Sequence, residues 1–170
     1  MKYTRFEELP VWKDAMQLAD RITVLLENRY FRLLRGLADQ LDRASVSVSN
    51  NIAEGFERGT TATRINYIYI AKGSAAETRS MLHGLAKRAT APDSTIRESR
   101  AEIKALIRLS ELVSRQLQGW AEYLQNSSLK GSRHVTTETR EGDERERRRE
   151  AFVQKLKQIA PPPKDPVLES

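Results

Sequence analysis

Few side chains in this sequence could do bond-breaking chemistry. The chain has two histidines, His83 and His134, and no set of carboxylates surrounds either at metal-ligand spacing. Glu54 and Glu77 could form a carboxylate pair, but a di-metal site in a helical bundle needs a Glu-x-x-His repeat, which is missing. Cysteine, a glycine-rich phosphate loop and a nucleophile elbow are also missing. We therefore expect no catalytic residue, metal site or cofactor, and we predict that the protein is not an enzyme.

The charge of the sequence makes binding to phosphates a candidate role. Its net charge is +6, and basic side chains recur along residues 34–88. Acids are interleaved with them, so a solvated mixed-charge face is an equal alternative for a single chain. In an oligomer, the excess positive charge of several copies would add up around one surface. The candidate nucleic-acid-binding residues are Arg35, Arg43, Arg58, Arg64, Lys72 and Arg79.

Four segments should position these residues. Their apolar side chains alternate at spacings of three and four over 11–25, 34–52, 65–85 and 96–124, which places them on one face of a helix. Stretches 45–49 and 65–70 have local strand character, but each lies inside a longer helical window. Short loops favour antiparallel neighbours. The sequence predicts an all-α, antiparallel up-down four-helix bundle over residues 1–126.

Local signals mark the expected helix ends. Pro10 stands where an opening helical turn tolerates proline. A threonine in the Gly59–Thr61 stretch can cap the third helix. Gly55 is predicted to stop the second helix in a left-handed conformation.

The third predicted helix is apolar on almost every side, so it must be covered on every side. A helix of a small four-helix bundle buries only one stripe, and the surplus face carries Tyr67 and Ile70. These two residues are the candidate subunit interface, with scattered exposed aromatics as the alternative. Gly73, among small neighbours, predicts close packing within the bundle, with a ligand site as the less favoured interpretation.

Residues 127–170 have a different character. A polar, aperiodic segment is followed by dense mixed charge and then by Phe152, Leu156 and Ile159 at helical spacing, before a run of prolines at 161–163. We predict a flexible linker and a short amphipathic helix, which should dock through these three residues on the bundle, a neighbouring subunit or a partner. No window resembles a signal peptide or a membrane span, so we expect a cytoplasmic protein without membrane contact.

Three motifs follow one another in order, Phe6–Lys13, Gln40–Phe56 and Ala71–Glu77. In these motifs the chain resembles the bacterial four-helix-bundle family first noted as proteins encoded in intervening sequences of large ribosomal RNA genes. Some members of that family serve as the accessory variability determinant of diversity-generating retroelements, a basic pentameric barrel that binds nucleic acid and a reverse transcriptase. The resemblance implies a homopentamer, with RNA or DNA and a reverse transcriptase as partners.

Two hypotheses follow for the function. The leading one is a non-catalytic, homo-oligomeric accessory protein that binds RNA or DNA through its phosphates and assists a reverse transcriptase of a retroelement. The alternative is a protein–protein scaffold without nucleic-acid binding, in which the tail helix recognises the partner.

Overall fold

A computed structural model describes residues 3–28, 31, 34–89 and 94–127 of the protein, together with residues 145, 146, 148–152, 154 and 155 of the tail. The chain divides into two units, Met1–Gly131 and Ser132–Ser170. All regular secondary structure in the described part of the first unit is helical. It contains the candidate site.

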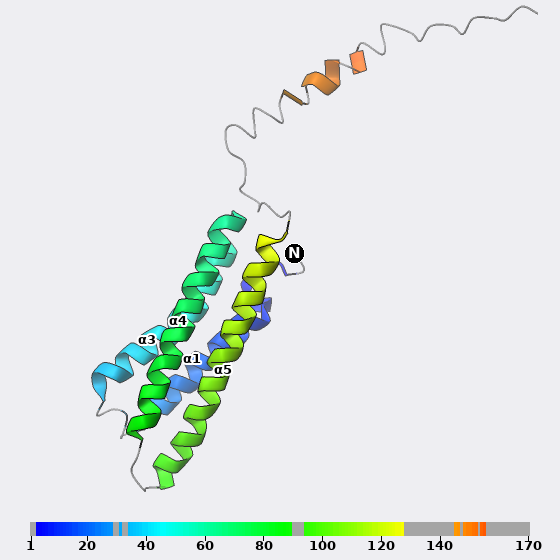
Figure 1. The fold of residues 1–170 in the computed structure, drawn as a ribbon. Helices are drawn as coiled ribbons and strands as arrows, with labels where there is room; N and C mark the ends of the chain where they lie inside the picture. Colours follow the sequence, from blue (N-terminus) through cyan, green and yellow to red (C-terminus); the bar gives the residue numbers. More distant parts are fainter. Residues whose placement is uncertain are drawn as a thin grey trace, which may run out of the picture. The chain divides into compact units, whose positions relative to one another are not determined.

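The first unit is a four-helix bundle. A short 3-10 helix η1, Phe6–Glu8, precedes α1, Pro10–Leu26, and three longer helices follow it: α3, Arg35–Glu57; α4, Thr61–Arg88; and α5, Ser94–Gln125. Consecutive helices run in opposite directions in Figure 1. The helix α4 packs against α3 and α5, and α1 closes the ring by contacting the same two helices. The predicted all-α antiparallel bundle is confirmed.

The core consists of the apolar stripes that the sequence predicted. One cluster of buried side chains lies toward the start of α1, and a second lies toward its end. The stretches 45–49 and 65–70 are both helical, because the longer helical period decides which face of the chain is buried. The side chains that are almost fully buried include Leu18, Ile22, Leu41, Val48, Ile52, Ile68, Leu82, Ile103, Leu106, Val113, Leu117 and Leu124.

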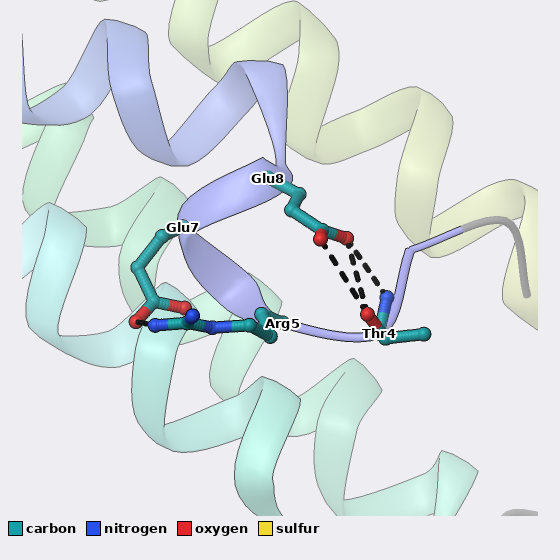
Figure 2. A network of polar contacts seen from close by, with 4 residues as sticks. All are labelled: Thr4, Arg5, Glu7 and Glu8. Carbon is teal, nitrogen blue, oxygen red and sulfur yellow. Dashed lines mark hydrogen bonds and ion pairs between the residues drawn. The ribbon is translucent and has the colours of Figure 1, made fainter.

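Polar contacts hold the segment that enters α1. The backbone N–H of Thr4 donates to Glu8 Oε2 at 3.0 Å, and Arg5 Nη2 donates to Glu7 Oε1 at 2.7 Å (Figure 2). The hydrogen bond from Arg5 lowers the pKa of the Glu7 carboxyl. Proline then occupies the first turn of α1, as predicted. These contacts fix the direction in which the chain leaves η1.

The start of α4 is capped by a threonine, as predicted. Thr60 Oγ1 accepts a hydrogen bond from the backbone N–H of Thr63 at 3.2 Å. The N–H groups of a first helical turn have no partner within the helix, and a cap of this kind typically contributes about 1 kcal/mol. The cap therefore sets the point from which α4 runs antiparallel to α3.

Gly55 does not stop α3, so that prediction was wrong. The helix continues through Gly55 to Glu57. A Cβ atom added at Gly55 would lie 2.7 Å from the Cβ atom of Tyr67 on α4. The residue is glycine because α3 and α4 approach each other closely here, not because the backbone turns.

The prediction for Gly73 was also wrong. A Cβ atom at this position would meet nothing within 4 Å, and the residue lies on the exposed surface of α4. Its neighbours Ala71 and Ala75 are buried, which places the tightly packed face of the helix on another side. Close packing within the described bundle therefore does not explain a glycine at position 73.

The second unit is described only in its helical residues between 145 and 155. Phe152 is 63% exposed there. Leu156 and Ile159, the other two predicted docking residues, lie outside the described residues. Crossing a membrane requires a longer apolar stretch than any helix in the described ranges contains.

Candidate nucleic-acid interface

Two of the predicted basic residues lie together on the side of α4 that faces α5. Lys72 Nζ donates to Gln118 Oε1 at 2.5 Å, and Arg79 Nη1 lies 3.9 Å from Glu111 Oε1. Both basic side chains are half-buried and line one depression between the two helices, with a volume of about 350 Å³. The other residues of its wall come from α5: Glu111, Ser114, Arg115 and Gln118.

The facing stripe of α5 adds more positive charge. Positions 104, 108, 111, 115 and 118 are separated by four, three, four and three residues, so they share one face of the helix. Glu111, Arg115 and Gln118 line the depression, Lys104 and Arg108 continue the same face of α5 toward its start, and Glu122 continues it toward its end. We call this surface the α4–α5 groove, and its cations are Lys72, Arg79, Lys104, Arg108 and Arg115.

The acids in the α4–α5 groove do not neutralise it. Glu111 is the acid of the five-position α5 stripe, and its separation of 3.9 Å from Arg79 is at the limit of an ion pair. Both partners are more than a third exposed, and exposed pairs of this kind contribute about 0–1 kcal/mol. Lys104, Arg108 and Arg115 are exposed to solvent. Several cations thus remain able to face a phosphate chain.

Arg58 belongs to a separate polar network between α3 and α4. It forms an ion pair with Glu54, and its Nη2 donates to the Tyr67 hydroxyl at 3.1 Å. That hydroxyl donates to Glu54 Oε1 at 2.7 Å. The hydrogen bonds from Arg58 and Tyr67 lower the pKa of the Glu54 carboxyl, and the bond to Glu54 raises the pKa of Tyr67. The charge of Arg58 is balanced within this network.

Arg64 is buried, with 8% of its surface exposed. Its guanidinium donates to the backbone carbonyl oxygens of Gly55 at 3.3 Å and Phe56 at 2.9 Å, and it stacks over the Phe56 ring at 5.2 Å. Loss of hydration on burial lowers its pKa. Arg64 therefore caps the last carbonyl groups of α3, a structural role that leaves little of it for a ligand.

The two remaining predicted cations lie on α3. Arg35 is exposed and lines a depression shared with the acids Glu27, Asp39 and Asp42. Arg43 is exposed and lies one turn before Ser47, whose hydroxyl is 3.0 Å from that of Ser74 on α4. Neither residue is among those lining the depression between α4 and α5.

The α5 cations of the groove were not among the sequence-predicted site residues. Their regular spacing was visible in the sequence, but the register between α4 and α5 was not. That register follows from the core, where buried residues of α4 pack with buried residues of α5 far away in the chain, Ile68 in one cluster with Leu117 and Leu82 in the other with Leu106.

The two predicted interface residues differ in their surroundings. Tyr67 is half-buried, with its hydroxyl engaged by Glu54 and Arg58. Ile70 is 44% exposed, and Gly73 follows it at three residues on the same exposed side of α4. The apolar surface left on α4 is thus carried by Ile70, and by Tyr69 next to it in the chain, rather than by Tyr67.

Residues 7–111 of the chain match the family described as 23S rRNA-intervening sequence protein. The chain belongs to this family. A search of the curated proteins gives no match. In this member of the 23S rRNA-intervening sequence protein family, the matched range includes Lys72, Arg79, Lys104 and Arg108, whereas Arg115 and the tail lie beyond it. The family that the three motifs predicted is confirmed, and the relation to the accessory variability determinant stays a prediction.

Proposed function

We propose that the protein is a nucleic-acid-binding accessory protein whose α4–α5 groove holds phosphate groups. The observation that carries this proposal is the depression lined by Lys72, Arg79 and Arg115, with Lys104 and Arg108 farther along the same face of α5. Contacts to phosphate give affinity without reading bases, so the groove would accept the backbone of either RNA or DNA. RNA is the first ligand to test, because the family resemblance implies RNA or DNA as a partner.

The direct test measures, by fluorescence anisotropy, how a labelled RNA binds to the full chain over a series of salt concentrations. We expect log Kobs to fall linearly with log salt, with a slope of about −0.7 for each phosphate neutralised on a single strand. Binding that does not depend on salt, or no binding at low salt, would overturn the proposal.

We further propose that the protein assembles with copies of itself through the exposed ridge of α4 that carries Ile70 and Gly73. A glycine inside a helix costs about 1 kcal/mol relative to alanine, and Gly73 gains no packing in the described bundle. With Ile70 beside it, this ridge offers an apolar surface that another backbone can approach closely. The family resemblance suggests five copies in a ring, which would bring several α4–α5 grooves together.

Sedimentation of wild-type and Ile70→Asp protein tests this assembly. We expect the wild type to sediment as an oligomer and the variant to shift toward the monomer, because a buried carboxylate without a partner is costly. Val24→Asp is the matched control, since Val24 is 67% exposed on α1 and away from the ridge. A wild type that stays monomeric at micromolar concentration would contradict the proposal.

A protein-binding role for the tail is the second candidate function. Phe152, 63% exposed on a highly charged helical segment, favours it because such an anchor fits the groove of a partner. We propose a reverse transcriptase as the partner to test first, on the basis of the family resemblance. If the wild type captures the reverse transcriptase and the Phe152→Ala variant does not, with RNA binding unchanged, this role is supported. Equal capture by the wild type and the variant would exclude Phe152 as the anchor.

A further inference from the structure

A second depression flanks α5 on the side opposite the α4–α5 groove. It lies between the start of α1 and the end of α5 and has a volume of about 390 Å³. Its lining is mainly apolar and includes three aromatic rings, Tyr3, Trp120 and Tyr123. Thr4, which follows Tyr3, is tied to Glu8 by the hydrogen bonds in Figure 2. We call this surface the aromatic depression.

Each depression has a buried side-chain oxygen in its wall that lacks a hydrogen-bond partner within the described residues. These atoms are Ser114 Oγ, beside the α4–α5 groove, and Gln116 Oε1, beside the aromatic depression. Buried polar atoms are nearly always paired in folded proteins, directly or through water, and the amide of Gln116 already donates from Nε2 to Asp14 Oδ2 at 2.7 Å. A hydroxyl can donate to a phosphate, and an amide oxygen accepts from an N–H group.

The exposed surface of α5 between the two depressions carries a glycine, Gly119. Gly119 is exposed, a Cβ atom there would meet nothing within 4 Å, and it lies between Gln118 on the groove side and Trp120 on the aromatic side. A chain that crosses the helix at Gly119 passes over bare backbone, with the cation of Arg115 one turn before it and the carboxylate of Glu122, which accepts from Gln118 Nε2 at 2.6 Å, one turn after it.

We propose that the aromatic depression binds an unpaired nucleobase of a strand whose phosphates lie in the α4–α5 groove and which crosses α5 at Gly119. This inference rests on the proposed function and names its ligand as single-stranded nucleic acid. Aromatic side chains stack on bases of any sequence. The edges of bases carry N–H groups, which are the kind of donor that the oxygen of the Gln116 amide lacks. An apolar peptide would fill the same depression, but it would have no use for the phosphate site across the ridge.

The proposal requires discrimination between single and double strands. A paired base cannot enter the depression, so a duplex would contact only the phosphate site. Full-length protein should therefore bind a labelled single-stranded oligouridine more tightly than a duplex RNA of the same length, at the same salt concentration. Loss of the Tyr123 ring should lower the affinity for the single strand about tenfold relative to the duplex, which is the effect typical of one stacked base.

Two variants test the site, with anisotropy as the measurement. Tyr123 is 58% exposed, so Tyr123→Ala should leave the fold intact, and Tyr123→Phe, which keeps the ring, is its matched control. Gly119→Leu should block the crossing without lowering the melting temperature, because its side chain has free space and leucine favours helix. We expect Tyr123→Ala and Gly119→Leu each to weaken single-strand binding about tenfold and to change duplex binding less than twofold.

The outcomes separate this inference from the function on which it rests. Equal effects on single and double strands, or no effect of either variant, would overturn the nucleobase site while leaving phosphate binding in place. A peptide as the true occupant would produce the second of these results. Failure of the wild type to bind any nucleic acid in a salt-dependent manner would overturn the proposed function itself.

Discussion

The two long sides of α4 differ in how they use polar residues. Toward α3, Arg58 and Arg64 are engaged by Glu54, Tyr67 and the last carbonyl groups of α3, and the helices approach closely at Gly55. Toward α5, Lys72 and Arg79 face a helix stripe that is itself basic. Arg64 on the first side is buried against the end of α3, whereas Lys72 and Arg79 on the second are the cations that the proposed function assigns to a ligand of opposite charge.

The largest effect should come from closing the space between α3 and α4. Gly55→Val would place its Cβ atom 2.7 Å from that of Tyr67, so one helix must move. We expect a loss of about 3 kcal/mol in the free energy of unfolding, measured by urea denaturation. Gly36→Ala is the control at an open position near the start of α3 and should be neutral or slightly stabilising. Equal stability of the two variants would show that the approach at Gly55 is not tight.

A smaller loss should follow removal of the buried cation. Arg64→Ala gives up the hydrogen bonds to Gly55 and Phe56 and leaves those carbonyl groups without this donor. We expect about 2 kcal/mol of destabilisation in urea denaturation. Arg79→Ala, on the opposite side of α4, should change stability by less than about 0.5 kcal/mol and instead weaken RNA binding. The comparison of the two sides fails if Arg79→Ala is the more destabilising variant.

The smallest effect concerns pH. The pKa of Glu54 is lower in the folded protein than in an unfolded chain, because Arg58 and Tyr67 donate to its carboxylate. Its contribution to stability is therefore present above the unfolded pKa of about 4.3 and is lost as pH falls through the lower folded value. Glu54→Gln should flatten the fall in melting temperature below about pH 4.3. Arg58→Gln, which removes the first of these donors, should flatten that fall as well, and a fall that neither variant changes would contradict the role of this pair.

The fold could be predicted because its main signal is local and repeated. Residues such as Leu18, Ile52 and Leu117 recur at helical spacing, and that period outweighs the local strand character of 45–49 and 65–70. The two glycines could not be interpreted locally. A glycine that admits a neighbouring helix looks the same in sequence as one that ends its own helix, and the contact of Gly55 with Tyr67 belongs to the tertiary packing.

The site could be predicted only in part, for the same reason. Lys72 and Arg79 were among the predicted residues, but Arg64 carries an equal formal charge and is buried against α3. Arg115 joins the depression only through the register of α5 on α4. The sequence shows how many charged side chains there are and how they are spaced, whereas the residues that pair with them depend on which helices pack together.

The measurement that tests the central claim most directly is a matched comparison of charge removal on the two sides of the bundle. The double variant Lys72→Gln/Arg115→Gln empties the α4–α5 groove of two cations, and Arg35→Gln/Arg43→Gln removes the same charge from α3. The account predicts that the first variant makes the slope of log Kobs against log salt shallower by about 1.4, as expected for two lost single-strand phosphate contacts. It predicts almost no change for the second, and equal changes in both would contradict the α4–α5 groove as the nucleic-acid interface.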